Sequence, residues 1–116
     1  FKTSARVNTV VVMRGEIYYV QLAPRSGSEQ QGTRPCIVVS TDAFNKVKTW
    51  QSITVVPLTS AKQWLKESPT VILLEEGEAN LPKVSAALAH QITTIDRSKL
   101  QNKIGTVSAD VLEQLE

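Results

Sequence analysis

The stretch Glu16-Ile17-Tyr18-Tyr19-Val20-Gln21-Leu22 decides the class of the fold. It is rich in β-branched and aromatic residues, which pack well on a pleated surface, so we predict a strand at 16–22. Pro24 ends this strand, and residues 24–34 carry the Pro, Ser, Gly, Glu and Gln residues that are typical of a long loop. The loop leads into a short apolar run at 35–40 (PCIVVS), which favours a buried strand.

Further short apolar runs continue this pattern toward the C-terminus. They predict strands at 52–58, 70–74, 84–89 and 103–107. Pro57 is expected to break the first of these strands near its end, because proline cannot donate to a ladder. An acidic turn region is expected at 75–82, and Ile92 is expected to open a further turn.

Helices are predicted only at corners and at the end of the chain. A short helix over 43–46 follows a Thr-Asp cap, and another over 96–100 begins at Asp96. A C-terminal helix is predicted over 108–115, with Ser108 as its N-cap. Short strands with few helices indicate a mainly β fold. The pattern is compatible with a small SH3-like barrel and with a compact β-sandwich, and it leaves both open.

The composition excludes several classes of site. The chain has 116 residues, of which 41% are hydrophobic, and this is enough for a core without disulfides or a structural metal. Its one cysteine, Cys36, cannot form an internal disulfide. One cysteine and one histidine also exclude Cys-based zinc sites, iron–sulfur clusters and multi-His metal sites. No apolar run approaches the roughly 20 residues that span a bilayer, so we expect a cytoplasmic protein without membrane association.

We expect the chain to consist of a short N-terminal extension and one domain. Residues 1–12 differ from the rest of the chain and are expected to be a flexible N-terminal extension or a remnant added to the native chain, and Met13 is a candidate native start. Residues 13–116 are expected to form a single domain. The net charge is +2, and on charge alone an ordinary solvated surface is the preferred interpretation.

None of the stronger catalytic signatures is present: the sequence has no GxxxxGKS/T, GxSxG, HExxH or GxGxxG motif. The loop over 25–35 nevertheless has an unusual density of polar groups. Arg34 is expected at the junction between this loop and the following strand. The sheet would hold its backbone in place there, and its guanidinium could bind a phosphate through two hydrogen bonds. By composition alone, an ordinary surface loop is the favoured interpretation. Four of its polar side chains can read base edges or bind sugars: Ser28, Glu29, Gln30 and Gln31. Ser26 is a further polar candidate for such contacts.

Several blocks of this sequence, in order, resemble the MazF/PemK toxin family. They are MRGEIYYV at 13–20, GSEQ at 27–30, RPCIVVSTD at 34–42, VVPLTS at 55–60 and HQITTIDRSKL at 90–100. The resemblance therefore runs from Met13 to the end of the chain. It implies a small barrel of the MazF/PemK/CcdB type with a C-terminal helix, built as a homodimer.

The same resemblance implies the toxin of a type II toxin–antitoxin system. Such a protein is a sequence-specific, metal-independent endoribonuclease that needs no cofactor and cleaves single-stranded mRNA. The ribose 2′-hydroxyl attacks the neighbouring phosphate and leaves a 2′,3′-cyclic phosphate and a 5′-hydroxyl. The implied protein partner is a cognate antitoxin with an acidic, largely disordered tail.

The family positions also imply site residues. Arg34 matches the residue that stabilises the phosphate in the transition state, and Thr59 matches a threonine whose hydroxyl can donate to a phosphate oxygen. His90 stands where relatives commonly carry an acidic residue, and histidine is suited to act as a base near neutral pH. A structural, hydrogen-bonding histidine is the commoner alternative. Gln91 and Trp64 are further candidate RNA contacts, Trp64 through base stacking.

Three positions depart from the family pattern. Leu88 and Thr93 stand where relatives carry Arg, and Gln31 stands where many carry Gly. These departures are expected to affect which RNA sequence is recognised and how fast it is cleaved, more than the type of reaction. Two other classes stay open: a non-catalytic toxin of the same fold that binds a protein target such as DNA gyrase, and an inactive RNA-binding module. The combination of Arg34 with Thr59 argues against the first, and the other departures keep the second open.

Overall fold

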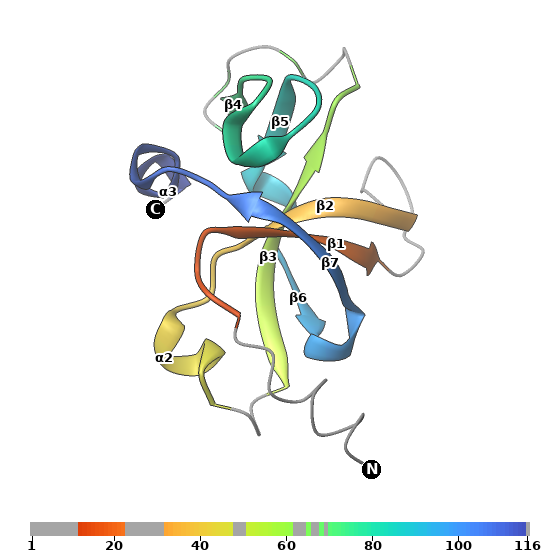
Figure 1. Ribbon diagram of the computed structural model, residues 1–116, viewed down its shortest axis with the longest axis vertical. Helices are drawn as coiled ribbons and strands as arrows, with labels where there is room; N and C mark the ends of the chain where they lie inside the picture. The colour runs from red at the N-terminus through yellow and green to blue at the C-terminus, as the bar shows by residue number, and fades with distance from the viewer. Residues whose placement is uncertain are drawn as a thin grey trace.

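The structure is a computed structural model, and it describes residues 12–22, 32–47, 51–61, 65, 68 and 70–115. These ranges form a sheet of seven strands in the order β4-β5-β3-β2-β1-β7, with β6 paired to β3 (Figure 1). The strands are β1 (Glu16–Leu22), β2 (Gly32–Val38), β3 (Ser52–Thr59), β4 (Val71–Leu74), β5 (Ser85–Leu88), β6 (Thr93–Asp96) and β7 (Leu100–Thr106). The helices are α2 (Asp42–Asn45) and α3 (Ala109–Leu115), and single 3-10 turns are η2 (Glu78–Asn80), η3 (Ala89–Gln91) and η4 (Arg97–Lys99).

The first two strands form an antiparallel pair. The strand predicted at 16–22 is confirmed, and the strand predicted at 35–40 begins earlier than expected. β1 has the predicted bounds, whereas β2 begins at Gly32, inside the stretch that we expected to be loop. Arg34 is paired with Val20 of β1, so it lies within a strand and not where loop becomes strand. The ladder to β1 outweighs the polar composition of this stretch, because strand formation depends on the partner strand more than on intrinsic preference.

β3 passes through Pro57 without the break that we expected near its end. Pro57 lies opposite Cys36 of β2. On its other edge, β3 pairs with β6 as far as Val55 and with β5 from Leu58 onward. Pro57 therefore lies in the gap between these two partners, where its missing N–H costs no ladder hydrogen bond.

The segment around Asp96 contains an unpredicted strand, β6. It also contains the N-cap at Asp96 that the sequence predicts. β6 precedes the cap and pairs with the first half of β3, although Ile92 was expected only to open a turn. The backbone N–H of Ser98 donates to Asp96 Oδ1 at 2.9 Å, which confirms the cap. The predicted helix is only one 3-10 turn, however, because β7 already begins at Leu100 and pairs with β1.

Apolar side chains cover both faces of the central strands. One cluster includes Ile17, Ile37, Val56 and Leu58 and is covered by Val111 of α3. The cluster on the other face includes Val20, Cys36, Val38, Ile53 and Val55. Since successive residues of a strand point to opposite faces, this double burial explains why the runs at 35–40 and 52–58 are apolar without alternation.

The C-terminal helix closes one of these clusters and begins as predicted. The backbone N–H of Val111 donates to Ser108 Oγ at 3.4 Å, so Ser108 is the N-cap. Leu112 and Leu115 pack against the same cluster as Val111. The mainly β class with a C-terminal helix is therefore confirmed.

The sheet of described strands is open, with β4 and β7 at the ends of the strand order. β3 joins its two parts, because its last residues pair with β5 and its first residues with β6. Figure 1 shows β4 and β5 at one end of β3, and β6 with α2 at the other. The ladder of the described strands is therefore not closed, in contrast to the small closed barrel that the resemblance implied.

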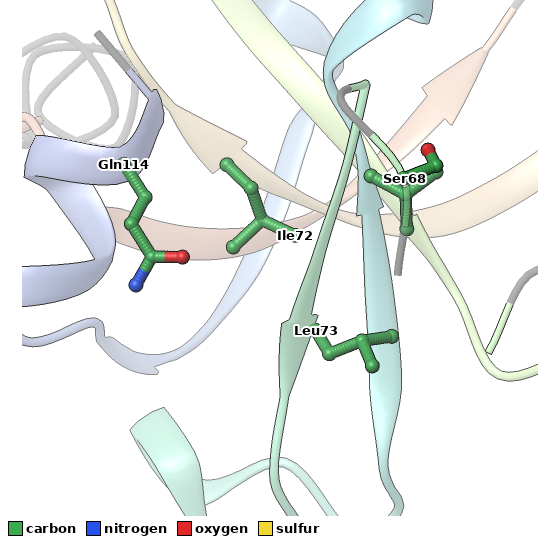
Figure 2. A pocket seen from close by; sticks show the side chains of 5 residues that line it. Ser68, Ile72, Leu73 and Gln114 are labelled. Atoms are coloured by element: carbon green, nitrogen blue, oxygen red, sulfur yellow. The ribbon is translucent and has the colours of Figure 1, made fainter. Parts of the chain in front are cut away.

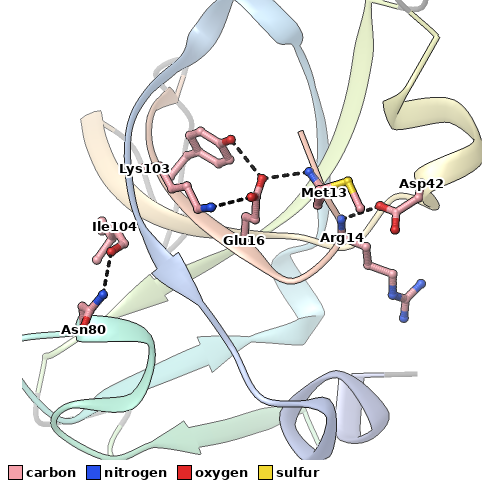
Figure 3. Close-up of polar contacts among 8 residues, drawn as sticks. Met13, Arg14, Glu16, Asp42, Asn80, Lys103 and Ile104 are labelled. Atoms are coloured by element: carbon pink, nitrogen blue, oxygen red, sulfur yellow. Dashed lines mark hydrogen bonds and ion pairs between the residues drawn. The ribbon is translucent and has the colours of Figure 1, made fainter. Parts of the chain in front are cut away.

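A buried carboxylate on β1 is linked to β7, the strand at one end of this order. Glu16 is almost fully buried, and its Oε1 accepts from the backbone N–H of Met13 at 2.8 Å and from the hydroxyl of Tyr18 at 2.9 Å (Figure 3). Its Oε2 lies 2.6 Å from Nζ of Lys103 on β7. Burial, followed by the hydrogen bond to Glu16, raises the pKa of Tyr18 well above its usual range.

Residues 1–11 lie outside the described part of the chain, so the proposed extension is described only at Val12, which is buried. None of the helices within the described ranges has the length and apolar character needed to cross a membrane.

Candidate active site

The register of two strands brings Arg34 and Thr59 to the same place. The β2–β3 ladder pairs Cys36 with Pro57 and Ile37 with Val56. Arg34 and Thr59 each lie two residues beyond the Cys36–Pro57 end of this ladder. Both residues line a hollow of about 220 Å³, which we call the Arg34 hollow. Two of the three candidate catalytic residues therefore lie together.

The Arg34 hollow combines an apolar floor with a polar rim. Leu58 and Leu81, which are buried, and Ile104 supply apolar lining. Positive charge comes from Arg34 and Lys83. The remaining lining residues are Tyr19, Pro35, Thr59, Ser60, Pro82 and Ser85, four of which carry hydroxyl groups. Cations and hydroxyl donors around a shallow hollow are suited to bind an anionic, polar ligand such as a phosphodiester.

The hydroxyl oxygen of Thr59 already accepts one hydrogen bond. The residue is 7% exposed and ends β3. The backbone N–H of Ala61 donates to its Oγ1 at 3.2 Å. A hydroxyl that accepts one hydrogen bond still has its own proton to donate, so Thr59 can donate to an oxygen bound in the hollow.

Arg34 is an exposed side chain on a fixed backbone. Its backbone pairs with Val20 of β1, and its carbonyl oxygen accepts from Sγ of Cys36 at 3.7 Å. The guanidinium is planar, positively charged and carries five N–H donors without an acceptor. It therefore supplies positive charge and paired donors to a phosphate, but not a proton acceptor.

His90 and Gln91 lie away from the Arg34 hollow. Both belong to η3, which follows β5 directly, and neither is among the residues that line the hollow. The side chain of His90 is exposed, and its Nε2 lies 3.5 Å from Nε2 of the buried Gln91. The structure thus does not bring the third candidate catalytic residue next to Arg34 and Thr59.

The candidate RNA contacts of the polar loop fall outside the described residues. This applies to Ser26, Ser28, Glu29 and Gln30, and also to Trp64. The two residues that flank the loop in the ladder are described, however: Leu22 pairs with Gly32. The loop therefore starts and ends on the β1–β2 hairpin, two residues along the chain from Arg34.

Sequence reasoning missed two side chains of the hollow that matter for a ligand. Lys83 lies between the turn predicted at 75–82 and the strand predicted at 84–89, and no motif singles it out. Alternation along the strand predicted at 16–22 indicates only that one of its two neighbouring tyrosines faces outward. That prediction is confirmed, because Tyr18 is 4% exposed and Tyr19 is 38% exposed. The outward tyrosine lines the Arg34 hollow.

A second, larger hollow of about 520 Å³ lies beside β4 (Figure 2). Its lining consists of Ser68, Val71, Ile72, Leu73 and Gln114. Ile72 lies between β4 and the side chain of Gln114 on α3. Among the described residues that line it, none carries a charged side chain, in contrast to the Arg34 hollow. Within the described ranges, no group of three or more His, Cys, Asp or Glu side chains is arranged to hold a metal ion.

Comparison with known proteins gives consistent matches along nearly the whole chain. The family model described as PemK-like, MazF-like toxin of type II toxin-antitoxin system matches residues 13–116. The endoribonuclease MazF9 of Mycobacterium tuberculosis is 40% identical over 109 residues, which cover 91% of each chain.

Solved structures agree with this match. The crystal structure of MazF from Deinococcus radiodurans aligns with a TM-score of 0.72 at 29% identity, over 91% of this chain and 90% of that chain. A MazE–MazF structure from the same organism aligns with a TM-score of 0.68 at 27% identity, over 91% of this chain and 89% of that one.

Proposed function

The chain belongs to the PemK-like, MazF-like toxin family of type II toxin–antitoxin systems, and on that basis we propose that it is a sequence-specific endoribonuclease that cleaves single-stranded mRNA. The observation that carries the proposal is the meeting of Arg34 and Thr59 in one hollow, from different strands. The 40% identity to an endoribonuclease over 91% of the chain supports the same reaction class.

The proposed reaction is transfer of the phosphate within the RNA backbone. The 2′-oxygen forms a bond to phosphorus, and the bond from phosphorus to the 5′-oxygen of the next nucleotide breaks. The products are a 2′,3′-cyclic phosphate and a 5′-hydroxyl. One proton leaves the 2′-hydroxyl and one reaches the 5′-oxygen, while negative charge grows on the non-bridging oxygens.

Each of the two residues in the hollow meets one of these demands. The guanidinium of Arg34 stabilises the charge on the non-bridging oxygens through paired N–H donors. The hydroxyl of Thr59, whose oxygen already accepts from Ala61, donates a further hydrogen bond to the same phosphate. With Arg34 supplying the charge, the proposed reaction proceeds without a metal ion or a cofactor.

Proton removal is proposed for His90. An imidazole is the side chain best suited to accept a proton near neutral pH, and that of His90 is exposed to a ligand. His90 is not among the residues that line the Arg34 hollow, so this role requires its imidazole to come within hydrogen-bond distance of the 2′-hydroxyl next to the phosphate bound by Arg34. This requirement makes the role testable on its own.

One further proposed RNA contact lines the hollow itself. Tyr19 offers an exposed ring at the hollow, on which a base can stack. The polar residues Ser26, Ser28, Glu29 and Gln30, together with Gln91 and Trp64, remain our candidates for reading the RNA sequence.

Two protein partners belong to the proposal. A cognate antitoxin follows from the family, and a MazE–MazF structure at 27% identity supports assembly with a second protein. We further propose that the chain acts as a homodimer in the cytoplasm, where its mRNA substrate is found.

The decisive experiment is cleavage of a long, mixed-sequence single-stranded RNA by the purified protein in EDTA, with mapping of the product ends. We expect discrete cuts with 5′-hydroxyl ends, and no cuts by the Arg34→Ala variant, whose fold and antitoxin binding should persist because the side chain is exposed. Full activity of a folded Arg34→Ala protein would exclude this site. Absence of cleavage by the folded wild-type protein would refute the proposed function and direct attention to a protein target.

A further inference from the structure

Thr59 has a cationic side chain on each of its two sides. In the sheet order, β3 lies between β5 and β2. Arg34 comes from β2, and Lys83 stands two residues before the start of β5, whose Ala86 pairs with Thr59. Both cationic side chains line the Arg34 hollow together with Thr59, although they come from different segments of the chain. Long Arg and Lys side chains can reach into such a space from both sides.

The segment that carries Lys83 is fixed by its neighbours along the chain. Leu81 is buried in the same core cluster as Leu58. On the other side of the lysine, the hydroxyl of Ser85 donates to the carbonyl oxygen of Lys83 at 3.1 Å. Lys83 itself is exposed and lines the Arg34 hollow. An exposed cation on a fixed backbone is well placed to bind an anion.

The turn before this segment is held against β7. Nδ2 of Asn80 donates to the carbonyl oxygen of Ile104 at 3.2 Å (Figure 3). Ala79 lies so close to Gly105 that a Cβ atom at Gly105 would be 2.3 Å from the carbonyl oxygen of Ala79. Ala79 and Asn80 both adopt positive φ angles, of 50° and 65°. Non-glycine residues adopt this conformation only where the surroundings impose it, so the wall that carries Lys83 has a defined position.

We propose that Lys83 is a second phosphate-binding residue, which holds a phosphate of the RNA strand adjacent to the one bound by Arg34. This inference rests on the proposed endoribonuclease function. The ammonium group of lysine is a compact point charge without the paired donors of arginine, so it is suited to hold a phosphate and not to stabilise the reacting one. Lys83 therefore acts on binding of the RNA and leaves the chemical step unchanged.

The test compares Lys83→Ala, Lys83→Arg and a matched control, Lys99→Ala. Lys99 belongs to η4, which follows the pairing of Asp96 with Ser52, so it lies at the end of β3 opposite to Thr59. The substrate is a short RNA that contains the cleavage sequence found by end mapping. Binding is measured with the same RNA carrying a 2′-O-methyl group at the cleavage position, over a series of NaCl concentrations.

We expect Lys83→Ala to raise KM about fivefold, since an exposed ion pair contributes up to about 1 kcal/mol, and to change kcat by less than about twofold. The plot of log binding constant against log salt should become less steep by about 0.7, the value for one phosphate contact on a single strand. Lys83→Arg should restore both values, and Lys99→Ala should match the wild type.

The outcomes separate this inference from the function on which it rests. Unchanged KM and salt dependence in a folded Lys83→Ala protein, with Arg34→Ala inactive, would overturn the role of Lys83 and leave the proposed function intact. A fall in kcat at constant KM would also overturn a binding role. Failure of the wild type to cleave any RNA would instead overturn the proposed function, and the role of Lys83 with it.

Discussion

Thr59 holds its hydroxyl in a position that makes a clear prediction at the scale of one residue. Thr59→Val keeps the shape of the side chain but removes the proton that the hydroxyl can donate. We expect kcat to fall about 100-fold, the typical loss for one donor to a developing oxyanion. Thr59→Ser keeps the hydroxyl and should retain most of the activity. Steady-state cleavage of a short RNA measures both variants, and equal rates for the two would remove the hydroxyl from the mechanism.

His90 provides a prediction about pH. A general base acts in its deprotonated form, so the cleavage rate of the wild type should rise with pH and then level off. His90→Gln lacks the imidazole nitrogen that accepts the proton, and we expect slower cleavage with an altered pH dependence. The measurement is the pH–rate profile of kcat/KM. A profile that is the same in both proteins would assign His90 a structural role, in line with its contact with Gln91.

The residues of the site differ in how well they can be predicted from the sequence. Arg34 and Thr59 were found through family positions, whereas their meeting depends on the register between β2 and β3. Register is a property of two strands together, and a shift of one residue would turn each side chain to the other face. Lys83 carries no motif at all. Only the pairing of β5 with β3 places it beside Thr59.

At the scale of elements, the errors fall where a partner strand decides the outcome. Residues 32–34 look like loop and are strand because β1 pairs with them. β6 has a Thr-Thr start and alternates between half-buried and exposed residues, which gives little apolar signal. It forms because the first half of β3 needs a partner on that edge. The predicted caps at Asp96 and Ser108 succeeded because capping is local.

The link between β1 and β7 makes a prediction about stability at high pH. Burial and Glu16 raise the pKa of Tyr18 in the folded state above its value of about 10 in the unfolded chain. The folded protein thus keeps the phenol proton when the unfolded chain has lost it. The stabilisation is complete below pH of about 10 and is lost as the pH rises further toward the folded-state pKa.

The Tyr18→Phe variant has no phenol proton to lose, so it should not show the fall in stability that Tyr18 causes at high pH. At neutral pH it should cost about 1 kcal/mol, because the hydrogen bond to Glu16 is lost. The measurement is Tm between pH 7 and 11 for the wild type, Tyr18→Phe and the exposed control Tyr19→Phe. The Tm difference between wild type and Tyr18→Phe should shrink above about pH 10. A constant difference over the whole range would show that Tyr18 does not contribute to the alkaline loss.

At the scale of the whole molecule, composition and short apolar runs predicted a mainly β domain with a C-terminal helix. They could not distinguish a barrel from a sandwich, because that depends on whether the outermost strands meet. In the described part of the chain they do not: β4 and β7 are the ends of the strand order. The Arg34 hollow takes its lining from β1, β2, β3, β7 and the segment before β5, so it is a product of this arrangement and of no single segment.

The distribution of charge over the molecule leads to a prediction about metal ions. In the proposed mechanism Arg34 provides the positive charge at the reacting phosphate that a divalent cation supplies in many nucleases, and Lys83 holds the adjacent phosphate. We therefore expect the same cleavage rate with and without EDTA. Added Mg²⁺ should slow cleavage at low RNA concentration, because it competes with both side chains for phosphate, and NaCl should act in the same direction. Rates at subsaturating RNA over a series of MgCl₂ and NaCl concentrations test this. If EDTA abolished cleavage and Mg²⁺ restored it, a metal ion would have to replace Arg34 as the main stabiliser of the reacting phosphate.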